Sequence, residues 1–430
     1  MTTLRIAGGQ VLRPDMTVER ADVLIDQDDG TILAVGDVVD ADETLDASDG
    51  LVIPGLVNAH CHAAMTLLRG YADDKPLDSW LREDVWPVEA ALTPEDVRAG
   101  TELGILEMIK SGTTGFADMY FEVDEVAEAV EEAGLRARIG HGVVTVGKDE
   151  EVAREDFETS LAIAEEFDGA AGGRIRTAVM PHSLTTVGEE YLDDYIPRTR
   201  DLGVPLHYHA NETRDEVAPI VEGRGKRPLE YAREMDMTGS SDFVAHGVHV
   251  NTTEIDLLAE TGTGVIHCPA SNMKLASGMA PVQAMLDAGV TVGLGTDGAA
   301  SNNDLDMFGE MRDAAMLGKL AANDASAVAA ESVVEMATRG SATALGFDSG
   351  RIEEGANADL AVIDLSSAHL VPHHDLVSHL AYAARGSDVR HTICDGTVLM
   401  ADREPLTLDE GSVLENAEKR AKELVERATE

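Results

Sequence analysis

The stretch LVIPGLVNAHCH at residues 51–62 begins with an almost uninterrupted apolar run and ends in two histidines. Apolar runs of this kind are typical of strands in a parallel sheet that helices cover on both faces. Seven more runs follow it, separated by amphipathic segments: TTGFADM (113–119), RARIGHGV (136–143), RIRTAVMPH (174–182), VPLHYHA (204–210), DFVAHGV (242–248), TGVIHCP (263–269) and VTVGLGTD (290–297). Eight strands alternating with helices over about 250 residues predict an α/β fold, a (β/α)8 barrel of the TIM type, because a doubly wound sheet usually has fewer strands.

One intervening helix is especially well marked. Thr93 is a favourable N-cap, Pro94 suits the first helical position, and the acidic Glu95 and Asp96 complement the helix dipole in the first turn. Apolar residues continue to Ile109, and Gly112 marks the end of the helical pattern. The pattern predicts a helix from Pro94 to about Ile109.

The two ends of the chain have a different character. Short β-like segments separated by turns fill residues 1–50, and similar segments recur as ADLAVIDL (358–365) and VRHTICDGTVLMAD (389–402). Two or three strands bury too little surface to be stable alone, so both ends are expected to meet in one small composite β-sandwich domain. We therefore predict residues 1–50 as its N-terminal part, residues 51–352 as the barrel, and residues 353–430 as its C-terminal part with a terminal helix over 412–428.

The composition is strongly acidic, with 33 Lys and Arg against 80 Asp and Glu and a formal net charge of −47. A polyanion is poorly suited to bind nucleic acid or an anionic membrane surface. Hydrophobic residues reach 44%, which is enough for a buried core. The acidic residues are spread along the whole chain, as in proteins that stay soluble in very high salt, so we expect a halophilic source, with an acidic mesophilic protein as the alternative.

Targeting signals are not expected from this sequence. No signal peptide and no apolar run long enough to span a membrane is recognisable, and the three cysteines, at positions 61, 268 and 394, are far apart. Widely spaced cysteines argue against a disulfide framework. A cytoplasmic protein is therefore predicted.

Histidines gather at the ends of the apolar runs, where a barrel of this type carries its chemistry. The residues in these positions are His60, His62, His182, His209, His246 and Asp297, and Glu212 follows His209 by three residues. His60 and His62 point to the same side because strand side chains alternate, so they form half of a metal site. An isolated HxH is more often a surface or packed pair, but the conjunction at the ends of different strands favours a metal-dependent active site. His207 is also expected to face the barrel interior, where packing is the simpler interpretation.

At these residues the sequence resembles the amidohydrolase superfamily and, within it, the methylthioadenosine/S-adenosylhomocysteine deaminases. The matching stretches are PGLVNAHCHAAMTLLRG (54–70), VWPVEA (85–90), GTTGFADM (112–119), MPHS (180–183), HYHANET (207–213), HGVH (246–249), CPASNMKLASGMAPV (268–282) and LGTDGAASNNDLDMFGEMR (294–312). The likeness covers nearly the whole chain. It implies a distorted (β/α)8 barrel with a small composite β-domain, in agreement with the pattern of strands.

The resemblance implies that His60, His62, His209 and Asp297 bind one divalent metal ion and leave a position for water. Zn²⁺ is the first choice for this set of ligands, although Fe²⁺ or Mn²⁺ would also suit it. The fourth run does not end in the lysine that binuclear relatives carry, so one metal ion is implied rather than two.

The implied reaction is hydrolytic deamination of an adenine at C6, with release of ammonia and an inosine-type product. Asp297 would accept a proton from the attacking water, and His246 would orient or polarise that water. Glu212, which is not a metal ligand, would carry a proton to the ring nitrogen. The implied substrates are 5′-substituted adenosines: 5′-methylthioadenosine, S-adenosylhomocysteine, 5′-deoxyadenosine or adenosine itself.

Substrate contacts follow from the same resemblance. Glu89 would accept hydrogen bonds from the ribose hydroxyls, with an acid on a loop surface as the alternative. His182 would contact the purine or the sugar, with a satisfied core histidine as the alternative. Trp86 would form an apolar wall for the 5′ substituent, with a packing role as an equal alternative. Arg154 corresponds to one of two arginines that hold the homocysteine carboxylate in relatives, with a solvated helix face as its alternative. The position of the other arginine carries His141. This departure favours neutral 5′ substituents.

Two other functions remain open at this point. The first is a different reaction on the same scaffold, such as deamination of guanine or cytosine or a chlorohydrolase-type reaction. The second is a non-catalytic barrel that binds a partner, although such a protein would usually have lost a metal ligand or the proton-transfer acid. For the hydrolase we expect a small purine nucleoside as substrate, a homo-oligomer, and no nucleic-acid or membrane partner.

Overall fold

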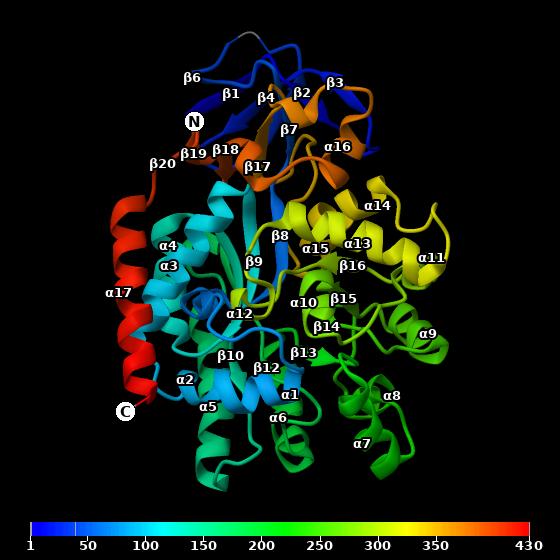
Figure 1. Ribbon diagram of the computed structural model, residues 1–430. Coiled ribbons are helices and arrows are strands. Elements are labelled where there is room, and N and C mark those ends of the chain that lie inside the picture. The colour runs from blue at the N-terminus through cyan, green and yellow to red at the C-terminus, as the bar shows by residue number, and fades with distance from the viewer. Residues whose placement is uncertain (1, 39, 430) are drawn as a thin grey trace.

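The computed structural model describes residues 2–38 and 40–429, and its centre is a barrel of parallel strands surrounded by helices (Figure 1). The barrel strands are β8 (Leu56–Cys61), β9 (Thr113–Tyr120), β10 (Arg136–Val143), β11 (Ile175–Thr177), β12 (Met180–Pro181), β13 (His207–Ala210), β14 (Phe243–His246), β15 (Gly264–His267) and β16 (Val292–Leu294). Two parallel bridges, Val179 with Leu206 and Ser183 with His209, close one seam. The Asp297 N–H donates to the His60 carbonyl at 3.0 Å across the other seam. The predicted barrel is confirmed.

Two predicted strands are each divided in two. The fourth apolar run forms both β11 and β12, and the first forms β7 (Gly50–Pro54) and then β8. β7 does not enter the barrel, because it pairs with β17 (Leu360–Asp364) and β2 (Gln10–Leu12) in another sheet. At Gly55, between β7 and β8, a Cβ atom would lie 2.1 Å from the Thr114 hydroxyl. Glycine is therefore required at the point where the chain passes from the second sheet into the barrel. Residues 50–54 therefore lie in the second sheet, whereas we expected the barrel to begin at residue 51.

Helices cover the outside of the barrel. They are α3 (Pro94–Lys110), α4 (Val123–Ala133), α5 (Glu150–Phe167), α6 (Glu189–Leu202), α7 (Arg214–Arg224), α8 (Pro228–Glu234), α9 (Thr252–Thr261), α10 (Pro269–Lys274), α11 (Val282–Asp287), α12 (Ala299–Asn302), α13 (Met307–Ala322), α14 (Ala330–Glu335) and α15 (Ser341–Ala344), and the short α1 (Leu77–Trp80) and α2 (Trp86–Glu89) follow β8. α3 begins as predicted, with Thr93 and Asp96 forming a reciprocal capping box. Within residues 2–38 and 40–429, no helix is both long enough and apolar enough to cross a membrane.

Both chain ends form the β-sandwich that lies at the top of Figure 1. One sheet has the order β5-β4-β1-β6 and the other the order β20-β19-β18-β17-β7-β2-β3. The strands not yet given are β1 (Thr3–Ala7), β3 (Val18–Arg20), β4 (Asp22–Asp26), β5 (Thr31–Gly36), β6 (Glu43–Asp46), β18 (Val389–Cys394), β19 (Thr397–Ala401) and β20 (Glu404–Pro405). Ile6, Ile25, Val52 and Leu360, drawn from both chain ends, share one buried core. The expected composite β-sandwich is therefore present.

Contacts between the sandwich, the terminal helix and the barrel fix their relative positions. The buried Arg136 of β10 donates to the Asp359 carboxylate at 2.7 Å, next to β17. α16 (Leu376–Tyr382) packs on α13 and α14. The terminal helix α17 (Glu410–Thr429) lies along α3, where Lys110 and Glu410 form an ion pair at 2.6 Å (Figure 1). The predicted helix over 412–428 is confirmed, and it stabilises the barrel wall rather than the sandwich.

The acidic composition predicts that stability rises with salt. With 80 Asp and Glu against 33 Lys and Arg, most carboxylates have no cation to pair with and repel one another. Raising the salt from about 0.1 M to about 1 M shortens the Debye length from about 10 Å to about 3 Å, so this repulsion is screened. We expect the midpoint of thermal unfolding, followed by circular dichroism, to rise by several degrees or more between these conditions. A sucrose solution of equal osmotic strength is the control, and an unchanged or lower midpoint in salt would contradict the prediction.

Candidate active site

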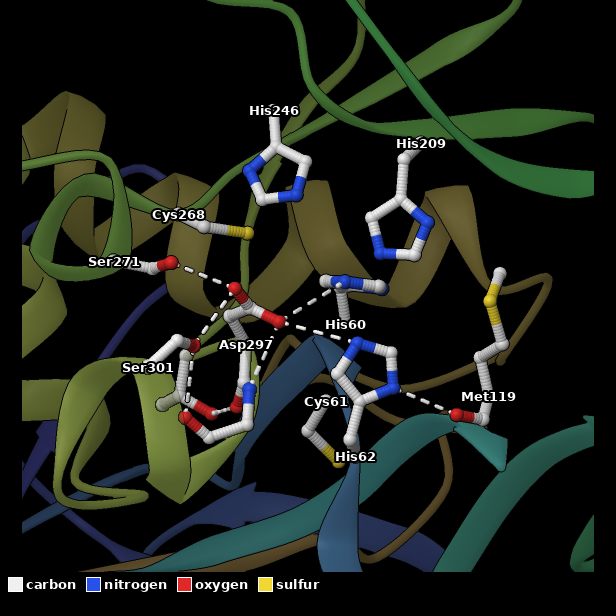
Figure 2. Close-up of polar contacts among 12 residues, drawn as sticks. His60, Cys61, His62, Met119, His209, His246, Cys268, Ser271, Asp297 and Ser301 are labelled. Carbon is white, nitrogen blue, oxygen red and sulfur yellow. Dashed lines mark hydrogen bonds and ion pairs between the residues drawn. The ribbon is translucent and has the colours of Figure 1, made fainter. Parts of the chain in front are cut away.

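Four predicted ligands converge at the C-terminal mouth of the barrel. His60 is the penultimate residue of β8 and His62 directly follows that strand, His209 comes from β13, and Asp297 follows β16. Their ligand atoms all lie within 4.8 Å of one another, and all four side chains are buried. Figure 2 shows the three imidazoles and the carboxylate turned toward a common point. The strand-end positions that the sequence singled out are thus brought together.

Hydrogen bonds fix which nitrogen each imidazole presents. Nδ1 of His62 lies 2.6 Å from the Met119 carbonyl and Nδ1 of His209 lies 2.7 Å from the His182 carbonyl. A carbonyl only accepts, so each Nδ1 carries a proton and each Nε2 is the nitrogen that faces the other ligands. Support of this kind orients histidine ligands in metal sites. Both rings are therefore prepared to bind a cation through Nε2.

His60 is oriented by a second histidine, and this role was not anticipated from the sequence. Nδ1 of His207 lies 3.0 Å from the Phe243 carbonyl and must donate to it, so Nε2 of His207 accepts from Nδ1 of His60 at 2.8 Å. Nε2 of His60 then has a free lone pair, and this buried atom has no hydrogen-bond partner. An unpartnered buried nitrogen that faces a carboxylate and two other imidazoles is what a metal ligand requires.

The charges at the site also suit a divalent cation. Burial lowers the pKa of His60 to about 4 and holds that of His209 well below its usual range, so both rings are neutral at pH 7. Burial alone would raise the pKa of Asp297, but the neighbouring imidazoles of His60 and His62 hold it well below its usual range. Without a cation, the same carboxylate raises the pKa of His62 to about 9 against the effect of burial, so a bound cation would take the place of the proton on Nε2 of His62. The residues present fit a divalent metal ion bound by three nitrogens and one oxygen.

Asp297 is held in place by its neighbours. Its Oδ2 accepts hydrogen bonds from the hydroxyls of Ser271 at 2.6 Å and Ser301 at 2.9 Å, and its Oδ1 lies 3.2 Å from Nε2 of His62 (Figure 2). The backbone φ of Asp297 is +61°, a left-handed value that is uncommon for residues other than glycine. His246 has a similar φ of +75°. Conformations of this kind persist where the surrounding contacts over-determine them, and they are frequent at functional sites.

A potential proton-transfer pair lies beside the four ligands. Oε2 of Glu212 is 3.8 Å from Nε2 of His246, whose Nδ1 is 3.0 Å from the side-chain oxygen of Asn272. Glu212 receives a long hydrogen bond of 3.4 Å from the hydroxyl of Ser277. Burial raises the pKa of Glu212 above its usual range, which favours the protonated carboxyl that a general acid requires. Both residues lie where the sequence predicted them.

The site opens into a cavity of about 1910 Å³, and Glu212, His246 and Asp297 are among the residues that line it. This exceeds the roughly 300–1,000 Å³ of most ligand pockets, so it has room for a small molecule with an extended substituent. Glu89 also lines it and accepts a hydrogen bond from the Tyr120 hydroxyl at 2.9 Å. Burial raises the pKa of Glu89 to about 7. Tyr120 was not identified from the sequence, because only the fold brings it to Glu89.

Of the other residues predicted to contact the substrate, some line the cavity and one does not. His182 and Trp86 line the cavity, and burial lowers the pKa of His182 to about 3, so its ring is neutral. His141 lines the cavity with its Nε2 3.8 Å from Asp156. Arg154 does not line the cavity. Its half-exposed guanidinium on α5 donates to Asp194 at 2.8 Å and lies over the ring of Tyr191. The structure therefore does not bring Arg154 to the site, because it lies on the solvated face of its helix.

Comparisons with known proteins agree with this geometry. A model of the amidohydrolase family matches residues 51–399. The chain is 69% identical over 430 residues to the 5-methylthioadenosine/S-adenosylhomocysteine deaminase of Haloarcula marismortui, with 100% of both chains covered. It is 46% identical to the 5′-deoxyadenosine deaminase of Methanosarcina mazei, with 95% of both covered. Several such relatives come from halophilic archaea, in line with the acidic composition.

Solved structures include similar chains with zinc. An adenosine deaminase from Xanthomonas campestris with bound zinc superposes with a TM-score of 0.93 at 36% identity, covering 99% of each chain. An atrazine chlorohydrolase from Arthrobacter aurescens TC1 complexed with zinc has a TM-score of 0.89 at 25% identity, covering 97% of this chain and 100% of its own. The chain therefore belongs to the amidohydrolase family and, within it, to the family of the methylthioadenosine/S-adenosylhomocysteine deaminases.

Proposed function

We propose that this protein hydrolytically removes the C6 amino group of the adenine in 5′-substituted adenosines. The observation that carries the proposal is the convergence of His60, His62, His209 and Asp297 with Glu212 and His246 beside one cavity. Relatives that are 69% and 46% identical over nearly their whole length are named as deaminases of such nucleosides. This likeness favours deamination over the chlorohydrolase reaction of the 25% identical neighbour.

The metal would be held by Nε2 of each of the three histidines and by Oδ1 of Asp297. We propose Zn²⁺, supported by three imidazoles and one carboxylate as donors and by the zinc in the adenosine deaminase from Xanthomonas campestris. When bound, such a cation would lower the pKa of a nearby water molecule. The serine hydroxyls on Oδ2 keep Oδ1 turned toward the histidines.

The protein side chains would supply the proton transfers. Glu212, with its raised pKa, would hold a proton and donate it to the adenine ring nitrogen next to C6, which makes C6 electrophilic. Asp297 would accept a proton from the attacking water, and His246 would orient that water through Nε2. A C6–O bond forms, the C6–N bond breaks, and the amino group leaves as ammonia after gaining a proton. The product carries a hypoxanthine base.

Glu89 and His182 would orient the nucleoside. The Tyr120 hydroxyl occupies only Oε1 of Glu89. The other oxygen, Oε2, can accept from the ribose hydroxyls. The neutral ring of His182, whose Nδ1 is 3.0 Å from the Thr186 hydroxyl, would offer Nε2 to the purine or sugar. Trp86 would line the region of the 5′ substituent.

The positions of Arg154 and His141 support a preference for neutral 5′ substituents. Arg154 lies outside the cavity lining, and His141 faces the carboxylate of Asp156. We therefore expect kcat/KM to change by less than about tenfold when the homocysteine group of S-adenosylhomocysteine is replaced by a methylthio group. A larger decrease in kcat/KM would require the loss of more than about 1.4 kcal/mol of binding free energy. A larger loss on removing the charged tail would contradict this prediction.

One experiment tests the proposed function and this preference together. Loss of adenine absorbance is followed for adenosine, 5′-methylthioadenosine, 5′-deoxyadenosine and S-adenosylhomocysteine, in high salt, before and after treatment with a chelator. Deamination that chelation abolishes and zinc restores is the expected result. Inactivity toward all four nucleosides, combined with activity toward guanine, cytosine or a chlorinated triazine, would refute the proposed substrate class.

We further propose that the protein acts in the cytoplasm as a homo-oligomer. Cys61, Cys268 and Cys394 are free and buried, which supports a reducing compartment. Apolar side chains of α13 are exposed, with Met316 at 43% and Leu320 at 73% of their surface, which supports a contact with a second copy of the chain.

A further inference from the structure

The turn that carries Glu212 is held by a second carboxylate, that of Glu216 in the first turn of α7. Oε2 of Glu216 accepts the backbone N–H of Glu212 at 2.7 Å, and Oε1 accepts that of Asn211 at 3.2 Å. The hydroxyl of Thr213, the N-cap of α7, accepts the N–H of Glu216 at 3.1 Å. Both oxygens of Glu216 are therefore used to fix two consecutive peptide groups between β13 and α7.

The backbone at this turn has an uncommon conformation. Asn211 has a φ of +57°, in the left-handed region. Its side-chain amide donates to both oxygens of the buried Glu254, at 3.1 and 3.2 Å, and Glu254 in turn accepts from Nε of Arg227 at 2.6 Å. A left-handed residue with contacts on both its backbone and its side chain is over-determined, as expected where strain serves a function.

The side chain of Glu212 is only weakly held by its own contacts. Its two polar neighbours are the Ser277 hydroxyl at 3.4 Å and Nε2 of His246 at 3.8 Å. The first is at the long end of hydrogen bonding and the second is beyond it, whereas the bond from its backbone N–H to Glu216 is 2.7 Å. The direction in which the Glu212 carboxylate points is thus set mainly by its backbone.

We propose that Glu216 is a positioning residue for the deamination reaction. Its carboxylate fixes the left-handed turn after His209 so that the carboxyl of Glu212 points into the cavity opposite His246. This inference rests on the proposed function, because it concerns the residue assigned to proton transfer. The assigned role is geometric, because both oxygens of Glu216 accept backbone N–H groups of the turn, although the residue also lines the cavity.

The role requires two acceptor oxygens, which makes glutamine an informative replacement. In Glu216→Gln the size is kept, but the amide NH₂ must face one of the two N–H donors, so one hydrogen bond becomes a repulsive contact. The matched control is Glu222→Gln, the same change on the same helix. Glu222 is exposed, lines only an outer groove, and makes no polar side-chain contact with the part of the chain that is described.

The test compares kcat, KM, bound metal and thermal unfolding of the two variants with the wild type. We expect Glu216→Gln to lower kcat roughly 100-fold, because a displacement of about 1 Å at a reacting group costs that much, and to leave KM within about twofold. Bound metal should stay at one per chain, and Glu222→Gln should match the wild type. An unchanged kcat, or a loss of kcat that only parallels loss of metal or of folded protein, would overturn the inference.

A double-variant cycle separates positioning from general stability. If Glu216 acts through Glu212, the pair Glu212→Gln/Glu216→Gln should have the same residual single-turnover rate as Glu212→Gln alone. If the rate of the double variant were instead reduced by the product of the two single-variant factors, the inference would be overturned. Failure of the proposed function gives a different result, because the wild type would then show no turnover of any adenosine, whereas failure of this inference leaves an active wild type and an equally active Glu216→Gln.

Discussion

Replacing Glu212 by glutamine is expected to abolish turnover while the protein keeps its metal. Glu212 lies beside His246 and is not among the four converging ligands, so its loss leaves His60, His62, His209 and Asp297 unchanged. Glutamine keeps the size and can still accept from Ser277, but it has no acidic proton to transfer. General acid–base catalysis of this kind contributes about 10² to 10⁴-fold, so kcat should fall by at least roughly 100-fold.

The measurement is steady-state deamination by the purified variant together with its metal content per chain. Glu222→Gln again serves as the control, because it removes one carboxylate from the exposed end of α7. Stoichiometric metal with a strongly reduced kcat is the expected pair of results. If the variant kept a kcat within about tenfold of the wild type, the assignment of proton transfer to Glu212 would be wrong.

The fold and the strand-end positions of the site could be predicted because both depend on local periodicity. A barrel strand buried on both faces is apolar throughout, and its last residues must face the mouth, so polar residues at these ends stand out. The choice of His60, His62, His209 and Asp297 as the ligands among them came from the family resemblance. The break at Gly55 could not be predicted in this way. β7 and β8 are both fully buried, and apolar residues look the same whether their sheet belongs to the sandwich or to the barrel.

The supporting residues were missed because their partners lie far away in the sequence. His207 orients His60 across a separation of 147 residues, and Tyr120 reaches Glu89 from a different element. Such contacts depend on the relative register of strands, which no local pattern records. For Arg154 the error was the reverse, because the sequence predicted a substrate contact that the structure does not show. Its position in the sequence corresponds to a substrate-binding arginine of relatives, but its side of α5 faces solvent and acidic neighbours.

Replacing Asp297 by alanine is expected to remove both metal and activity. The carboxylate is the only negatively charged ligand of the four, and its Oδ1 lies 3.2 Å from Nε2 of His62 and 3.6 Å from Nε2 of His60. Without it, the three remaining imidazoles would bind a divalent cation more weakly, and the proposed acceptor for the proton of the attacking water would be absent. Together these losses should lower kcat/KM by roughly 10⁴-fold or more.

Two companion variants show which property of Asp297 matters. Asp297→Asn keeps an oxygen that can accept from Ser271 and Ser301 but removes the charge, so it should fold like the wild type and still bind metal poorly. Asp287→Ala, at an exposed carboxylate that contacts Gln283, should retain both metal and activity. Metal content per chain and the chelator-sensitive rise in the unfolding midpoint are measured for all three. Stoichiometric, tightly held metal in Asp297→Ala would show that the carboxylate is not a ligand. The metal would then have to be assigned to the histidines alone.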